Sequence, residues 1–142
     1  MKILVINGPN LNLLGIREPE IYGSNTYNDL CNLLNEFASN HKIQLNILQS
    51  NHEGQIIDYI HEGYFNNYDG IIINPGAYTH YSYAIHDAIS SIPTPVVEVH
   101  ISDISKRESF RQYSVISDVC KKSIMGKGLN GYIEAIEFII KN

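Results

Sequence analysis

Short apolar runs alternate with longer segments of helical periodicity along this chain, and this alternation constrains its fold more than any other feature. Ile71-Ile72-Ile73 is apolar at every position, which is typical of a strand that is covered on both faces. Between such runs, apolar residues such as Leu30, Leu34 and Ala38 recur at helical spacing. Strands are predicted at residues 2–6, 43–48, 71–73, 96–100 and 122–125, and helices at residues 26–38, 56–64, 84–89 and 133–140.

The length of the chain, 142 residues, suits one domain with a substantial core, so residues 1–142 are expected to form a single domain. Alternating strands and helices with right-handed crossovers predict the α/β class and a doubly wound parallel sheet. Five strands suggest the flavodoxin-like order 2-1-3-4-5, in which the first, third and fourth strands are neighbours.

Polar segments follow these three strands at residues 7–10, 74–77 and 100–102. The carboxyl ends of neighbouring parallel strands meet at one edge of the sheet, where α/β proteins bind their ligands. We therefore expect the three segments to converge on one crevice.

Two pairs of side chains near this crevice suit acid–base chemistry. Tyr22 lies five residues after Arg17 in a loop with glycine and proline, and a fixed cation favours the charged form of a phenol, whose ordinary pKa is about 10. Glu98 and His100 are two residues apart in a strand and point to the same face, so the carboxylate can orient the imidazole as a proton donor.

The familiar cofactor sites do not match the sequence. Neither G-x-x-x-x-G-K-[ST] nor G-x-G-x-x-G follows the first strand, where a phosphate-binding loop would lie, and no Ser or Thr lies between Lys2 and Tyr22 to hold a flavin phosphate. Asn7 and Asn74 stand where a receiver domain needs acids for magnesium, and the histidines lack metal-ligand spacing. We therefore expect no cofactor and no metal. Asn10 and Asn74 are expected to hold a substrate oxygen or a water during proton abstraction beside a carbonyl and loss of a protonated leaving group.

The formal net charge of -5 disfavours nucleic acid and anionic membranes as partners. No apolar run approaches the roughly 20 residues of a membrane span, and no signal-type segment precedes the first strand. Cys31 and Cys120 fall in apolar patterns, which favours buried reduced thiols. A cytoplasmic protein without nucleic-acid or membrane partners is therefore expected.

Several segments resemble the signature of the type II 3-dehydroquinate dehydratases. The first is Asn7-Gly8-Pro9-Asn10-Leu11-Asn12-Leu13-Leu14-Gly15, followed by Arg17 and Tyr22-Gly23; later blocks are residues 74–80, 84–85, 87–88, 98–102, 107–108, 110–111 and 114–117. Together they span nearly the whole chain. The resemblance implies a flavodoxin-like hydro-lyase, a homododecamer built as a tetramer of trimers, and a place in the shikimate pathway to chorismate and aromatic amino acids or in quinate breakdown.

The resemblance also implies roles for individual residues. Tyr22 would remove a proton from C2 of 3-dehydroquinate, with Arg17 stabilising its anion. Asn10 would position a water at the resulting enolate, and His100 would protonate the departing C1 hydroxyl in a reversible anti elimination to 3-dehydroshikimate. The implied substrate-binding residues are Asn74, His80, Ile101, Ser102 and Arg111, with Asp87 supplied by a neighbouring subunit, and the supporting residues are Glu98 and Arg107.

Two alternatives stay open: a catalytically silent flavodoxin-like module that binds a small polyol acid, and a flavin-binding electron carrier. The chain departs from the family pattern at Lys127, Asp103 and Ser105, none of which replaces a proposed catalytic group. The chain has ten tyrosines, and four of them are interpreted as packing or surface residues: Tyr59, Tyr64, Tyr68 and Tyr132.

Overall fold

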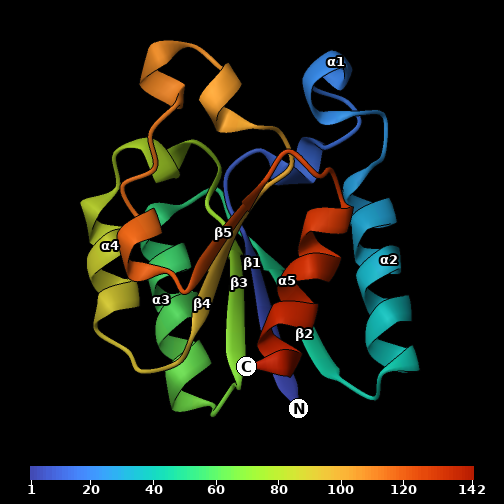
Figure 1. Cartoon of the computed structure of the whole chain (residues 1–142), viewed down its shortest axis with the longest axis vertical. Coiled ribbons are helices and arrows are strands. Elements are labelled where there is room, and N and C mark those ends of the chain that lie inside the picture. The colour runs from blue at the N-terminus through green and yellow to red at the C-terminus, as the bar shows by residue number, and fades with distance from the viewer.

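The chain folds around a five-stranded parallel sheet in the order β2-β1-β3-β4-β5, which confirms the predicted topology (Figure 1). The computed structural model describes all of residues 1–142. Every predicted strand is present within two residues of its expected bounds. The strands are β1 (Lys2–Asn7), β2 (Gln44–Gln49), β3 (Gly70–Asn74), β4 (Val96–His100) and β5 (Lys122–Met125).

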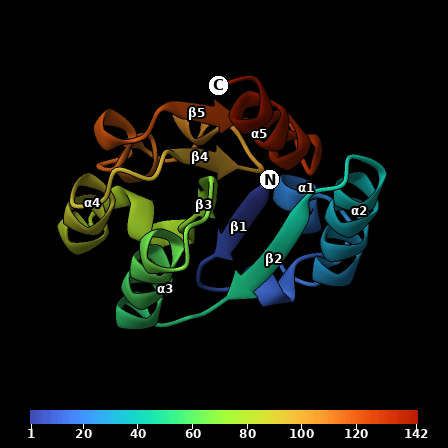
Figure 2. The same cartoon turned by 90° about the horizontal axis from the view of Figure 1, so that it is seen from below.

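Two main helices cover each face of the sheet (Figure 2). One face carries α2 (Tyr27–Asn40) and α5 (Asn130–Lys141), and the other carries α3 (Glu53–Phe65) and α4 (Tyr83–Ser90). The predicted start of α2 near Thr26 is confirmed, because Thr26 and Asp29 form a reciprocal capping box at the beginning of this helix.

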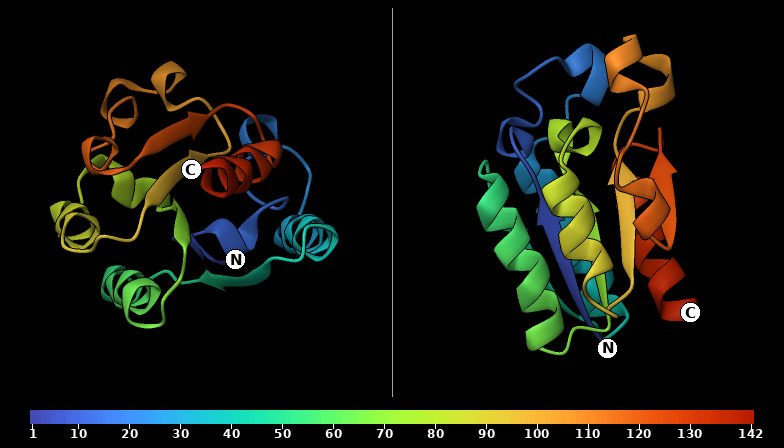
Figure 3. Two further views of the ribbon diagram at one scale, coloured as in Figure 1. Left: turned by 60° about the horizontal axis from the view of Figure 1, so that its bottom comes forward. Right: turned by 90° about the vertical axis from the view of Figure 1, so that its left-hand side faces the viewer.

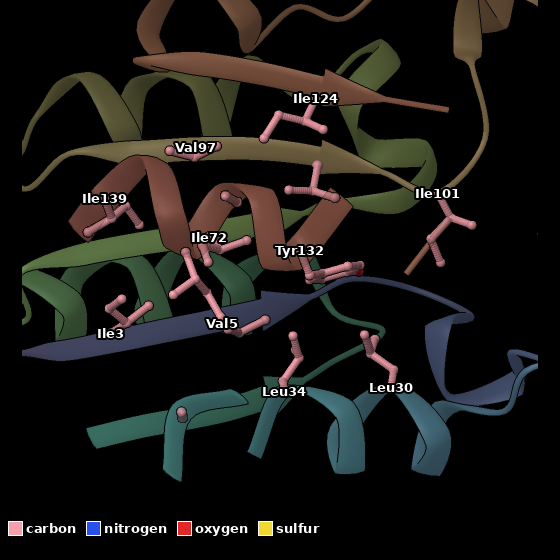
Figure 4. Close-up of a cluster of buried hydrophobic side chains, with 14 of the residues drawn as sticks. Ile3, Val5, Leu30, Leu34, Ile72, Val97, Ile101, Ile124, Tyr132 and Ile139 are labelled. Atoms are coloured by element: carbon pink, nitrogen blue, oxygen red, sulfur yellow. The ribbon is translucent and has the colours of Figure 1, made fainter. Parts of the chain in front are cut away.

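Alternate strand residues supply two apolar cores. Ile3, Val5 and Ile72 pack beneath α2 and α5 (Figure 4), whereas Leu4 and Ile73 pack beneath α3 and α4. All five side chains are buried, so the inner strands are covered on both faces as their apolar runs predict.

The structure also contains short helices that the periodicity did not predict, and all except Ser117–Val119, which leads into the start of β5, surround the carboxyl ends of the strands (Figure 3). Each contains five residues or fewer, which is too short for an apolar stripe to develop. Tyr22 consequently ends a short helix rather than lying in an irregular loop. These elements are η1 (Leu11–Leu13), α1 (Pro19–Tyr22), η2 (Gly76–His80), η3 (Ile104–Lys106), η4 (Ser109–Arg111) and η5 (Ser117–Val119).

The ends of β1 and β3 lie in close contact. Asn7 and Asn74 are register partners, and the Gly8 amide donates to the carbonyl of Asn74 at 2.7 Å. A Cβ atom on Gly8 would lie 2.6 Å from the backbone of Pro75, so only glycine fits here without displacing the chain. The two loops that follow these strands are thereby held together.

Two further features concern the cysteines and the apolar character of the helices. Cys31 and Cys120 are free thiols, and each is partly rather than fully buried, which corrects the expectation of full burial. None of the helices combines the length and apolar character that crossing a membrane requires.

Candidate active site

A pocket opens at the carboxyl end of the sheet, where the three polar segments meet as expected. It is lined by 16 residues that come from the ends of β3 and β4, from the loop after β1, and from the short helices and loops above the sheet. Ten of the twelve candidate site residues line it: Asn10, Arg17, Tyr22, Asn74, His80, His100, Ile101, Ser102, Arg107 and Arg111.

Tyr22 contacts two guanidinium groups. Nη1 of Arg107 donates to the Tyr22 hydroxyl at 3.1 Å, while the guanidinium carbon of Arg17 lies 4.6 Å from the centre of the phenol ring. Arg17 also lies 3.6 Å from the carboxylate of Glu18. Arg107 is thus the cation at the hydroxyl, whereas the sequence assigned that place to Arg17. Burial lowers the pKa of Arg107, but its hydrogen bond to Tyr22 and its charge interactions with Tyr22, Glu108 and Glu18 together outweigh burial and raise that pKa overall, so the guanidinium stays charged.

His100 is held by a buried carboxylate. Both His100 and Glu98 extend from β4, and Nε2 of His100 lies 2.5 Å from Oε2 of Glu98. Burial alone raises the pKa of Glu98, but hydrogen bonds from His100 and from neighbouring serines outweigh burial and lower it to about 2. Glu98 is therefore a carboxylate throughout the neutral range and can fix the orientation of the imidazole.

Four hydroxyl groups complete the surroundings of Glu98. Thr79 and Ser114 donate to Oε2 at 2.8 and 2.6 Å, and Ser117 and Ser123 donate to Oε1 at 2.6 and 2.8 Å. We call these four groups the hydroxyl cage, and the sequence did not predict that they surround one carboxylate. Its members come from η2, β5 and the segment around η5, and only the fold brings them to one carboxylate.

Asn10 has a strained backbone that a neighbouring loop supports. Its φ angle is 69°, in the left-handed region, and its amide donates to Oδ1 of Asn51 at 3.0 Å. The same Oδ1 accepts from Nε2 of Gln49 at 3.0 Å. These contacts fix the backbone from which the Asn10 side chain enters the pocket.

Asn74 is bonded on both sides of its amide. Its Oδ1 accepts from the Gly76 amide at 3.2 Å, and its Nδ2 donates to the hydroxyl of Tyr132 at 2.9 Å. Sequence reasoning placed Tyr132 correctly among the packing residues but missed its hydrogen bonds, because helical spacing predicts burial and says nothing of where a hydroxyl points.

The remaining pocket residues are held from the segment between β4 and β5. Nδ1 of His80 lies 2.8 Å from the carbonyl oxygen of Tyr113. Arg111 forms an ion pair with Glu108 at 2.9 Å, and its guanidinium carbon lies 4.6 Å from the centre of the Phe110 ring. The mouth of the pocket thus carries a third guanidinium, beside those of Arg17 and Arg107, and suits an anionic ligand.

Asp87 lies outside the pocket of its own chain. It belongs to α4, and its side chain is 78% exposed. Its Oδ1 lies 3.0 Å from Nδ1 of His86, and the other ring nitrogen of His86 faces Asp118 at 3.4 Å. The hydrogen bond to Asp87 is the main cause that raises the pKa of His86. An exposed Asp87 is available to another molecule rather than to this pocket.

The pocket therefore combines a phenol in contact with two cations, an imidazole that a carboxylate orients, and two amide side chains. A phenolate can remove a proton, a protonated imidazole can return one to a leaving group, and the amides can bind oxygen atoms on which charge develops. No group of three or more His, Cys, Asp or Glu side chains has an arrangement that could hold a metal ion.

Comparison with known proteins gives a consistent picture. Residues 1–140 match the family model "Dehydroquinase class II". A protein of Caldicellulosiruptor saccharolyticus named 3-dehydroquinate dehydratase is 58% identical over 135 residues, which cover 95% of this chain and 93% of the relative. One of the same name from Clostridium perfringens is 54% identical and covers 100% of this chain and 97% of its own. The crystal structure of a type II dehydroquinase from Butyrivibrio crossotus superposes with a TM-score of 0.97 at 57% identity, covering 99% of this chain and 97% of that one.

Proposed function

This chain belongs to the class II dehydroquinase family, and we infer that it catalyses the reversible elimination of water from 3-dehydroquinate to give 3-dehydroshikimate. It is accordingly a hydro-lyase of the shikimate pathway. The family match extends over almost the entire chain, and the pocket is lined by a phenol, an imidazole and amide side chains that suit acid–base chemistry.

Tyr22 is the proposed base. As a phenolate it takes the proton from C2, beside the ketone, and the electrons of the C–H bond move into an enolate. The hydrogen bond from Arg107 and the position of Arg17 at the ring support this role, because two cations stabilise a phenolate more than a neutral phenol. Asn10 is proposed to hold a water against the enolate oxygen, where negative charge accumulates.

His100 is the proposed acid. It donates a proton to the C1 hydroxyl, which leaves as water while the enolate electrons form the new double bond to C1. The contact with Glu98 supports this assignment, since the carboxylate holds the imidazole ring in one orientation. Tyr22 and His100 line the same pocket from different elements, which suits an anti elimination with base and acid on opposite sides of the substrate.

The polar groups that remain are assigned to substrate binding. Arg111 is proposed to bind the carboxylate, together with backbone amides of Ile101 and Ser102, while Asn74 and His80 bind hydroxyl groups. Each of these residues lines the pocket, and a guanidinium matches the geometry of a carboxylate.

We also propose that the chain assembles as a homododecamer, a tetramer of trimers, in which Asp87 of one subunit reaches the pocket of the next. The exposure of Asp87 supports this, as do four aromatic side chains at the pocket end of the molecule that are at least 60% exposed: Tyr81, Tyr83, Phe110 and Tyr113. A cytoplasmic location is proposed as well, because two free thiols suit a reducing compartment.

Subunit mixing tests the shared site. Tyr22→Phe and Asp87→Ala chains, each inactive alone, should regain part of the activity when they are dissociated and reassembled together, because some pockets then combine an intact Tyr22 with an intact Asp87. Wild-type chains taken through the same procedure are the control. No recovery in an assembled mixture would show that Asp87 does not act across subunits, and a monomeric wild type would refute the dodecamer.

The hydrogen bond between Arg107 and Tyr22 is the observation that carries the proposed mechanism. The first experiment mixes the purified wild type with 3-dehydroquinate and follows the ultraviolet absorbance of the conjugated product, with a second sample treated with borohydride beforehand in the presence of substrate. Turnover that survives borohydride is expected. Loss of turnover after borohydride would point to a lysine imine, and a folded wild type without turnover would favour the catalytically silent binding module.

A further inference from the structure

A chain of buried hydrogen bonds joins the pocket to helix α2. It starts at Asn74, whose Nδ2 donates to the Tyr132 hydroxyl at 2.9 Å. The Tyr132 hydroxyl donates to Oδ1 of Asn7 at 2.7 Å, and Nδ2 of Asn7 donates to the Tyr27 hydroxyl at 3.4 Å. Four residues from β3, α5, β1 and α2 are thus joined in one relay.

Tyr132 is the centre of this relay and is sealed from solvent. Its relative exposure is 0%, and it extends from α5 among apolar side chains such as Val5 and Leu30 (Figure 4). Gly131 permits this depth, because a Cβ atom there would lie 3.3 Å from Val99. Burial raises the pKa of Tyr132, so the phenol keeps its proton and serves as a hydrogen-bond donor.

The bonds fix which way the Asn74 amide points. Because the Tyr132 proton goes to Asn7, its oxygen is left to accept, and only Nδ2 of Asn74 can donate to it. Oδ1 of Asn74 then receives the Gly76 amide at 3.2 Å. One N–H and one lone pair of the Asn74 amide stay free to serve a ligand. Rotating the amide by half a turn would break both existing bonds in a buried place.

We infer that Tyr132 is a positioning residue: its hydroxyl holds the Asn74 amide in the one orientation that presents a fixed donor and acceptor to the substrate. The inference rests on the proposed function, since it takes Asn74 as a substrate ligand. Tyr132 itself does not line the pocket and acts through Asn74 alone.

The test compares two Tyr→Phe variants that each remove one hydroxyl from the relay. Tyr132→Phe frees Asn74, and kcat/KM for 3-dehydroquinate should fall by roughly 10- to 100-fold, as expected for a misplaced binding group. Tyr27→Phe is the matched control: its hydroxyl bonds Asn7 but not Asn74, and kcat/KM should stay within about twofold of the wild type. The melting temperatures of both variants measure the loss of stability that removing each hydroxyl causes.

A double-mutant cycle separates positioning from general damage. In an Asn74→Ala background, adding Tyr132→Phe should lower kcat/KM by less than about threefold, because the residue through which Tyr132 acts is already gone. Equal losses in both backgrounds, or a folded Tyr132→Phe with wild-type kcat/KM, would overturn the inference. If Tyr132→Phe does not fold, Asn7→Ala removes the acceptor that orients the same hydroxyl; wild-type kcat/KM in folded Asn7→Ala would overturn it too. A wild type without turnover would overturn the proposed function, and this inference with it.

Discussion

Replacing Glu98 with glutamine removes the charge from the centre of the hydroxyl cage while keeping the size of the side chain. Glu98 is fully buried, and burial alone raises its pKa. The hydrogen bonds from His100 and the serines nevertheless lower the pKa from 4.5 to about 2. At about 1.4 kcal/mol for each pH unit, this depression corresponds to roughly 3 kcal/mol in favour of the folded state.

The sign of the effect determines its pH window. A carboxyl whose pKa is lower in the folded state than in the unfolded state contributes its full stability above the unfolded value of 4.5 and loses it as the pH falls toward about 2. A neutral glutamine resembles the protonated acid. The free energy of unfolding of Glu98→Gln should therefore be roughly 3 kcal/mol below that of the wild type at pH 7, and the difference should shrink to about half or less by pH 3.

Urea unfolding measures this difference, with tyrosine fluorescence or circular dichroism as the signal and one fixed protein concentration from pH 7 to pH 3. Glu134→Gln is the control, because Glu134 pairs with Lys127 at the surface and such a pair contributes little. A difference between wild type and Glu98→Gln that is the same at every pH would refute the reasoning, as would one below about 1 kcal/mol at pH 7.

Two further predictions concern groups around the pocket. Arg107→Ala should lower kcat by roughly a hundredfold or more, because it removes the positive charge at the Tyr22 hydroxyl, whereas Arg107→Lys keeps that charge and should lose less. Steady-state kinetics measures kcat for both variants. Equal kcat in the wild type and both variants would argue against a role of Arg107 in stabilising the Tyr22 anion. Gly8→Ala should lower the melting temperature and kcat/KM, because the new Cβ would lie 2.6 Å from the Pro75 backbone. Gly54→Ala is the control and should change neither quantity much, because a Cβ there would meet nothing within 4 Å. A Gly8→Ala protein with wild-type melting temperature and kcat/KM would show that the loops after β1 and β3 are not tightly held together.

The architecture could be predicted because the residue composition of the inner strands shows that they are buried. An all-apolar run such as Ile71-Ile72-Ile73 is stable only when both faces are covered, and helical spacing between such runs leaves few other topologies. The positions of Asn74 and His100 followed from the same rule, because both end neighbouring strands.

The contacts within the site could not be predicted in the same way. Tyr22 and Arg107 are 85 residues apart, and neither periodicity nor spacing joins two loops over such a distance. Tyr132 occupies an ordinary core position of an amphipathic helix, so its spacing is satisfied by packing alone. Ser123 is a single hydroxyl in a short strand, and its partner Glu98 becomes apparent only when β4 and β5 lie in register.

The proposal that Tyr22 is the base leads to one decisive measurement. Tyr22→Phe removes only the phenol oxygen and leaves a ring on which Arg17 can still lie. With 3-dehydroquinate as substrate, kcat of Tyr22→Phe should be at least about a thousandfold below that of the wild type, as expected for loss of a general base. The dissociation constant of 3-dehydroquinate from Tyr22→Phe should stay within about threefold of the KM of the wild type. A Tyr22→Phe protein that keeps more than about a tenth of the wild-type kcat would contradict the proposed mechanism.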